Sequence, residues 1–191
     1  NAVNNREVLL DRQRPDLRVL RPATLRNLKD RSSGDDMRVD LALQGPVSLA
    51  ILQSLTGDVR LHDQLARLRR TGVTECVLSG FDLVIARTGY TGEDIGYELF
   101  VHPDRAVEFW ETLLAAGQPF GLQPAGLAAR DSTRTEAGLP LYGHEISAEI
   151  TPLEAGLGMF AKLDKPFIGR DALVRQKEEG LKRKVVGFEL L

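Results

Sequence analysis

The stretch TGYTGEDIGYEL, residues 88–99, joins two segments of strand-like sequence through a loop that holds three glycines and an acidic pair. Alternation of apolar and polar residues with a period of two is typical of β-strands. The segment before the loop, VTECVLSGFDLVIART, predicts a hairpin that turns at Ser79-Gly80, because such small residues favour two-residue turns. Residues 97–101 predict a further strand after the loop.

Apolar residues at helical spacing surround these strands. Pro103 begins a predicted helix that ends at Gly117. Phe109, Trp110 and Leu113 share its apolar face and are predicted to lie in the core. Further helices are predicted over residues 5–13, 45–55, 61–70, 124–137 and 169–179, and further strands over residues 37–43 and 184–191. Since strands and helices do not alternate regularly, the pattern predicts an α+β fold with antiparallel or mixed sheets and packed helices.

Charge and composition exclude several classes of function. The chain has 191 residues, 25 of them basic and 27 acidic, and its formal charge is -2. Such a balance gives no electrostatic surface for nucleic acid or for an anionic membrane. No apolar run reaches the roughly 18 to 20 residues that a membrane span needs. Cys76 is the single cysteine, and the three histidines are scattered, so we expect a reducing cytosolic or organellar compartment and no metal site.

The glycines of the loop do not have the spacing of a phosphate-binding motif. They fall at Gly89, Gly92 and Gly96, and the loop joins strand to strand, whereas a dinucleotide-binding loop joins strand to helix. Glu93 and Asp94 would also repel a phosphate. The simplest interpretation of the loop itself is a solvated turn in which glycine supplies positive φ.

Glu98 is the acid that a solvated turn does not explain. It lies inside the strand that follows the loop, and alternation places it on one face with Gly96 and Phe100. A carboxylate beside an aromatic ring on an inward face is costly unless a group donates hydrogen bonds to it. Two kinds of donor fit: a guanidinium, or the edge of a planar ligand that carries two parallel N–H groups.

A candidate guanidinium comes from LAARDSTRTEAG, residues 127–138. Arg130 and Arg134 are four residues apart and share one face of the predicted helix, and Asp131 can pair with Arg134. A surface ladder of ion pairs is the alternative interpretation. Small apolar neighbours surround Arg130, and they leave room for a second planar group to dock there.

The sequence TPLE, residues 151–154, has the form of a helix capping box. Thr151 would accept a hydrogen bond from the backbone of Glu154, and the Glu154 side chain would reach back to the backbone of Thr151. This pattern favours a structural role for Glu154 over a catalytic one.

Four motifs, in this order and spacing, closely resemble the glycine cleavage system T-protein family of tetrahydrofolate-dependent aminomethyltransferases. The motifs are RTGYTGEDIGYEL, GLAARDSTRTEAGLPLYGHEI, EITPLEAGLGMFAKLDKPFIGRDAL and KRKVVGFEL. The opening NAVNNRE is similar to the VNAANRE segment of the same family. The resemblance covers essentially the whole chain and is dense from Arg87 onward.

The resemblance implies a folate-binding body followed by a C-terminal β-barrel. It also implies a reaction in which the aminomethyl group on the lipoyl arm of H-protein passes to tetrahydrofolate. In the family, the glutamate that matches Glu98 binds the amino edge of the pterin, and the arginine that matches Arg130 contacts the folate. Tyr90 and Asn1 match residues that line the same pocket. The role implied for Glu98 agrees with its chemistry, because one carboxylate can accept both N–H groups of a pterin edge.

The chain also departs from the family pattern. Ile95 is one residue more than the family has between the loop and the glutamate, so either a bulge absorbs it or Glu98 is displaced. The catalytic aspartate of the family lies upstream of the residue that matches Asn1. We therefore expect a partial folate-binding body over residues 1–183, the first strand toward a barrel over residues 184–191, and a chain without catalytic activity of its own.

Two other kinds of folate protein are alternatives. The folate-dependent domains of sarcosine and dimethylglycine dehydrogenases share TPLEAGLG but vary the block ARDSTRTEAGLPLYGHEI, which this chain retains. Non-enzymatic folate-binding proteins that assist iron–sulfur cluster assembly carry a cysteine in the motif K-G-C-x-x-G-Q-E. The corresponding DKPFIGRDA has Pro166 and no cysteine. Both alternatives are therefore weaker than the aminomethyltransferase.

Overall fold

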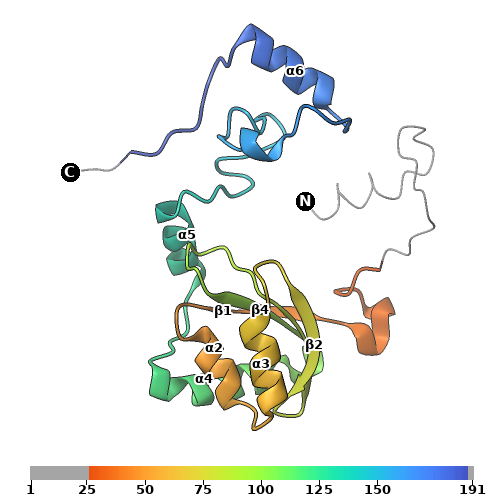
Figure 1. Ribbon diagram of the computed structural model, residues 1–191, viewed down its shortest axis with the longest axis vertical. Coiled ribbons are helices and arrows are strands. Elements are labelled where there is room, and N and C mark those ends of the chain that lie inside the picture. Colours follow the sequence, from red (N-terminus) through yellow and green to blue (C-terminus); the bar gives the residue numbers. More distant parts are fainter. Residues whose placement is uncertain (1–25, 189–191) are drawn as a thin grey trace.

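A four-stranded antiparallel sheet forms the centre of the computed structural model, which describes residues 26–188 (Figure 1). The strands lie in the order β1-β4-β3-β2. Their bounds are β1 (Val39–Gln44), β2 (Val73–Leu78), β3 (Phe81–Ala86) and β4 (Gly96–Val101). The hairpin of β2 and β3 turns at Ser79 and Gly80, both at positive φ, as the sequence predicts. Together with the packed helices, the sheet confirms the α+β class.

Among the described residues, three α-helices cover one face of the sheet, and two more follow later in the chain. Figure 1 shows α2, α3 and α4 gathered beside the sheet, with the chain beyond α5 leading away to α6. The α-helices are α2 (Ser48–Ser54), α3 (Val59–Arg67), α4 (Ala106–Gly117), α5 (Leu127–Glu136) and α6 (Arg170–Glu179). Short 3-10 helices are η1 (Arg31–Asp36), η2 (Pro103–Arg105), η3 (Gln118–Phe120) and η4 (Gly158–Phe160).

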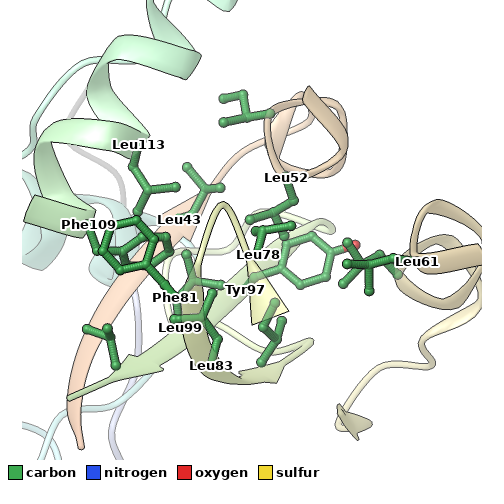
Figure 2. Close-up of a cluster of buried hydrophobic side chains, with 14 residues drawn as sticks. Leu43, Leu52, Leu61, Leu78, Phe81, Leu83, Tyr97, Leu99, Phe109 and Leu113 are labelled. Atoms are coloured by element: carbon green, nitrogen blue, oxygen red, sulfur yellow. The ribbon is translucent and has the colours of Figure 1, made fainter. Parts of the chain in front are cut away.

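The hydrophobic core lies between the sheet and helices α2, α3 and α4 (Figure 2). Alternate residues of β4 point into it, and Tyr97 and Leu99 are fully buried. The rings of Phe81 and Phe109 pack 4.9 Å apart in the same cluster. The prediction that Trp110 lies in the core is wrong, because Trp110 is 38% exposed. The face of α4 that is buried holds Phe109, Leu113 and Gly117.

The register of β4 fixes the direction of Glu98. β4 pairs with β1 and β3 without interruption, and Ala42 and Ala86 lie opposite Glu98 on the two sides. Tyr97 therefore points into the core and Glu98 to the other face of the sheet. Ile95 lies just before the strand, where its carbonyl accepts a 2.9 Å hydrogen bond from Gly45. The additional residue is thus accommodated before β4 without a bulge.

One loop glycine is required by close packing against α5. Gly92 has φ +91°, and a Cβ atom built on it would lie 2.5 Å from Cβ of Ala137. Two methyl groups cannot approach that closely, so the loop touches the end of α5 only because residue 92 has no side chain.

We expect Gly92→Ala to destabilise the fold by about 2 kcal/mol, because it combines an unfavourable φ with a steric overlap. The measurement is urea unfolding. Gly121→Ala is the matched control, since Gly121 has φ +78° and open space around its Cβ position. The double variant Gly92→Ala with Ala137→Gly should recover the part that comes from the overlap. Equal destabilisation by Gly92→Ala and Gly121→Ala would show that packing against α5 contributes nothing.

The C-terminal part of the described chain differs from two predictions. Thr151 and Glu154 exchange the two hydrogen bonds of a capping box, at 2.9 and 3.3 Å, but on a turn rather than at the start of a helix. Arg183 adds an ion pair to the buried carboxylate of Glu154 at 3.0 Å, which confirms the structural role of Glu154. The strand predicted from residue 184 is wrong for residues 184–188, which form no strand. In this segment the backbone N–H of Val185 donates a hydrogen bond to the carbonyl of Glu154.

Two predictions concern residues that precede the described range. The helix predicted over residues 5–13 and the site residue Asn1 lie outside it. No helix between residues 26 and 188 is long and apolar enough to cross a membrane.

Candidate functional site

Glu98 occupies a half-buried position on the face of the sheet opposite the core. Its neighbours across the strands are Ala42 and Ala86, whose small side chains leave the carboxylate uncovered by the sheet itself. Burial and the nearby carboxylate of Asp40 raise the pKa of Glu98, and the positive charge of Arg130 acts in the opposite direction. Arg130, on α5, therefore favours the ionised form of Glu98.

Arg130 also contacts the loop that precedes β4. Its guanidinium carbon lies 5.3 Å from the centre of the Tyr90 ring, a cation–π contact. The Tyr90 hydroxyl donates a hydrogen bond to the carbonyl of Pro140. The structure thus brings together three of the four residues that the sequence predicts for the site, Glu98, Arg130 and Tyr90, from a strand, a helix and a loop.

This arrangement suits a flat ligand with polar edges. The ionised carboxylate of Glu98 is a pure acceptor with two oxygens. The Arg130 guanidinium is planar and a pure donor, and it is already stacked against an aromatic ring. A planar ring with an N–H edge and an acceptor edge would find complementary groups at both residues.

An ion network around the buried Arg134 fixes the segment that follows α5. Arg134 is only 2% exposed. Its guanidinium donates to Asp131 at 2.7 Å, to the carbonyl of Leu139 at 3.2 Å and to Glu145. Glu145 in turn accepts from the backbone of Leu141 at 2.9 Å.

This network changes one interpretation of the sequence. The predicted pair of Asp131 and Arg134 is present, but the interpretation as a surface ladder is wrong for Arg134. The sequence offered no signal for Glu145, because its partner lies 11 residues away across an irregular loop. By tying that loop to α5, the network holds Pro140 where the Tyr90 hydroxyl meets it.

A cavity of about 560 Å³ lies beside Tyr90 on the C-terminal side of the site. Its wall is apolar and comes mostly from residues that follow α5. The lining residues are Tyr90, Leu139, Pro140, Ile146, Pro152, Leu157, Phe160, Ala161, Phe167 and Leu173. Tyr90 is the link between this cavity and the polar pair, because Glu98 and Arg130 do not line it.

The residues that the structure describes contain neither a cluster of metal ligands nor an activated thiol. No group of three or more His, Cys, Asp or Glu residues there could hold a metal ion. Cys76 is half-buried on β2, where burial and the nearby Asp82 raise the pKa of its thiol. A raised pKa makes a thiol less reactive at neutral pH.

Gln44 is a residue of the site that the sequence did not identify. Its side chain stands at the end of β1 and hydrogen bonds to the loop that carries Tyr90. A glutamine gives no pattern of its own in a sequence, so only the fold reveals these contacts.

Comparison with known proteins defines the family. Residues 13–165 match the family described as the GCVT N-terminal domain. Because this match covers most of the chain, the chain belongs to that family.

Curated relatives and a solved structure agree with this membership. An aminomethyltransferase of Caldanaerobacter subterraneus subsp. tengcongensis is 51% identical over 82% of this chain and 41% of its own length. One of Alkaliphilus metalliredigens is 48% identical over 90% of this chain and 46% of its own length. A crystal structure of glycine cleavage system aminomethyltransferase T from Bartonella henselae superposes with a TM-score of 0.60 and 33% identity, over 75% of this chain and 37% of that one. The chain thus spans less than half the length of the curated relatives that it matches.

Proposed function

We propose that this chain is the folate-binding part of an aminomethyltransferase of glycine cleavage. The whole protein takes the aminomethyl group from the lipoyl arm of H-protein, passes it to tetrahydrofolate as co-substrate, and releases ammonia and 5,10-methylenetetrahydrofolate. The observation that supports this most is the meeting of Glu98, Arg130 and Tyr90 in a chain of this family. The proposed setting is the cytoplasm, or the mitochondrial matrix in a eukaryote.

In this proposal Glu98 recognises the pterin. Its carboxylate accepts from the ring N–H and the amino group along one edge, a charge-assisted pair of hydrogen bonds. Arg130 and Tyr90 border the folate, and Asn1 is proposed as a fourth binding residue on its match to the family alone. None of these four residues is proposed to remove or supply a proton in the reaction.

The pKa of Glu98 leads to a prediction on pH. Burial is the main cause that raises the pKa of Glu98, and Asp40 raises it further. The carboxylate therefore takes up a proton at a higher pH than an exposed glutamate does. A protonated Glu98 no longer accepts two hydrogen bonds. We therefore expect tetrahydrofolate affinity to fall as the pH is lowered from 7, and to begin to fall at a pH at which an exposed glutamate is still ionised. Calorimetry at a series of pH values measures this. An affinity that stays constant to below about pH 4.3, the ordinary value for glutamate, would contradict this.

The transfer reaction itself is tested by ammonia release. The full-length protein that contains this chain is incubated with aminomethylated H-protein, with and without tetrahydrofolate. We expect release that depends on tetrahydrofolate, and no turnover of sarcosine or dimethylglycine. Turnover of those amines would support the dehydrogenase-linked alternative, and folate binding without either activity would support the non-enzymatic one.

The same assay on residues 1–191 tests where catalysis resides. We expect a rate at least about 10²-fold below that of the full-length protein, the usual loss when a positioned acid or base is absent. A rate close to that of the full-length protein would place the catalytic carboxylate within this chain, with Asp94 as the first candidate.

A further inference from the structure

We propose that Gln44 is a positioning residue that holds Tyr90 and Glu98 in one ligand site. The inference rests on the proposed folate-binding function and deepens it, because it assigns the group that sets the distance between two of the binding residues.

Gln44 is placed for this task by the register of the sheet. It is the last residue of β1 and lies opposite Gly96, the first residue of β4. Alternation along β1 directs its side chain to the face on which Glu98 lies. The side chain then passes over Gly96 and reaches the loop that connects β3 to β4.

The hydrogen bonds of Gln44 span both ends of that loop. Its amide nitrogen donates to the carbonyl of Thr88 at 3.2 Å and to that of Tyr97 at 3.4 Å. Its amide oxygen accepts from the Thr91 hydroxyl at 3.0 Å. One side chain therefore ties together the start, the middle and the end of the segment.

Two of these contacts adjoin the residues proposed to bind the ligand. Thr88 and Thr91 stand on either side of Tyr90, so their bonds to Gln44 restrict the backbone from which the Tyr90 ring projects. The carbonyl of Tyr97 belongs to the peptide group that leads into Glu98. A change at Gln44 would thus move both binding residues without touching either.

Close packing shows that the amide fits its place tightly. A Cβ atom built on Gly89 would lie 1.9 Å from Oε1 of Gln44, and one built on Gly96 would lie 2.4 Å from the same atom. Both glycines of the motif therefore make room for Gln44. A Cβ atom at either position would require the Gln44 amide to shift from this place.

The test compares two variants of Gln44 with a matched control. Gln44→Met keeps the length of the side chain and removes its hydrogen bonds, and Gln44→Glu keeps the acceptor but loses both donor bonds. Gln53→Met is the control, because Gln53 lies on α2 and makes one long bond to the carbonyl of His62. Tetrahydrofolate affinity is measured by calorimetry on the full-length protein, well below its unfolding temperature. Hydrogen exchange is followed for the amides of residues 88–97.

We expect Gln44→Met and Gln44→Glu to weaken tetrahydrofolate binding by about 3- to 10-fold, which is the effect of losing about one hydrogen bond. Loop amides should exchange faster in both, and Gln53→Met should leave both readouts unchanged. Combining Gln44→Met with Glu98→Gln should give a loss smaller than the product of the two single losses, because both act on the same contact.

The outcomes separate this inference from the proposed function. Wild-type affinity in both Gln44 variants would overturn the positioning role, even if their unfolding temperature drops. If the unaltered full-length protein binds no tetrahydrofolate, the proposed function fails, and the exchange data decide on Gln44 alone. Exchange of residues 88–97 in Gln44→Met that matches Gln53→Met would then overturn its role in the loop.

Discussion

Glu98→Gln is expected to weaken tetrahydrofolate binding by about 1.5–3 kcal/mol, or roughly 10- to 150-fold in the dissociation constant. Glutamine keeps the shape of the side chain but replaces one acceptor oxygen by a donor. The pterin edge presents donors as well, so one charge-assisted hydrogen bond is lost and a donor faces a donor. Isothermal titration calorimetry on the full-length protein gives the affinity directly.

Loss of stability does not explain such an effect. The pKa of Glu98 is raised in the folded state, so the folded state binds a proton more readily than the unfolded chain does. Ionisation of Glu98 therefore lowers the stability as the pH rises through the folded pKa, and the neutral glutamine removes that cost at pH 7. Glu93→Gln is the matched control, because Glu93 is exposed in the loop that precedes β4. This variant should bind tetrahydrofolate as the unaltered protein does. Equal affinity of Glu98→Gln and the unaltered chain would remove Glu98 from the pocket.

Arg134→Met is expected to destabilise the chain by about 2 kcal/mol, less than for a fully buried pair, because it removes a buried guanidinium whose two carboxylate partners are partly exposed. Arg134 is the buried residue of α5, and its guanidinium joins Asp131, Glu145 and the carbonyl of Leu139. Without it, two carboxylates face each other and a carbonyl loses its donor. Urea unfolding measures the change in the free energy of unfolding.

The control for this prediction is an ion pair of the same type at the surface. Arg67 lies 3.8 Å from Asp63, and their side chains are 82% and 67% exposed. Exposed pairs of this kind contribute less than about 1 kcal/mol, so Arg67→Met should have little effect. If Arg134→Met changes stability no more than Arg67→Met, the network does not hold α5 to the segment that follows it.

The sheet could be predicted from local signals. The turn at Ser79-Gly80 and the alternation on both sides of it are short-range features, and β2, β3 and β4 follow them within a residue or two. The sequence correctly predicts that Glu98 and Tyr97 point to opposite faces of the sheet, because side chains alternate between the two faces along a strand. The loop glycines were interpreted only as turn residues, since their close contacts with Gln44 and Ala137 involve residues more than 40 positions away.

The errors arose where partners distant in the sequence decide the outcome. An apolar face on α4 was visible, but which edge of that face turns to solvent depends on the helix's position on the sheet, and Trp110 lies on that edge. The burial of Arg134 depends on Glu145, which reaches it through an irregular loop. For residues 184–188 the sequence has strand character, yet a strand also needs a neighbouring strand, and within the described residues none pairs with this segment.

The most direct test of the folate site is a crystal structure of the full chain with tetrahydrofolate bound. We predict that the amino edge of the pterin lies within about 3.2 Å of the Glu98 carboxylate, the range of a hydrogen bond, with Arg130 and Tyr90 beside the ligand. Tetrahydrofolate bound on another face of the sheet, with the Glu98 carboxylate in contact with water alone, would contradict the proposal.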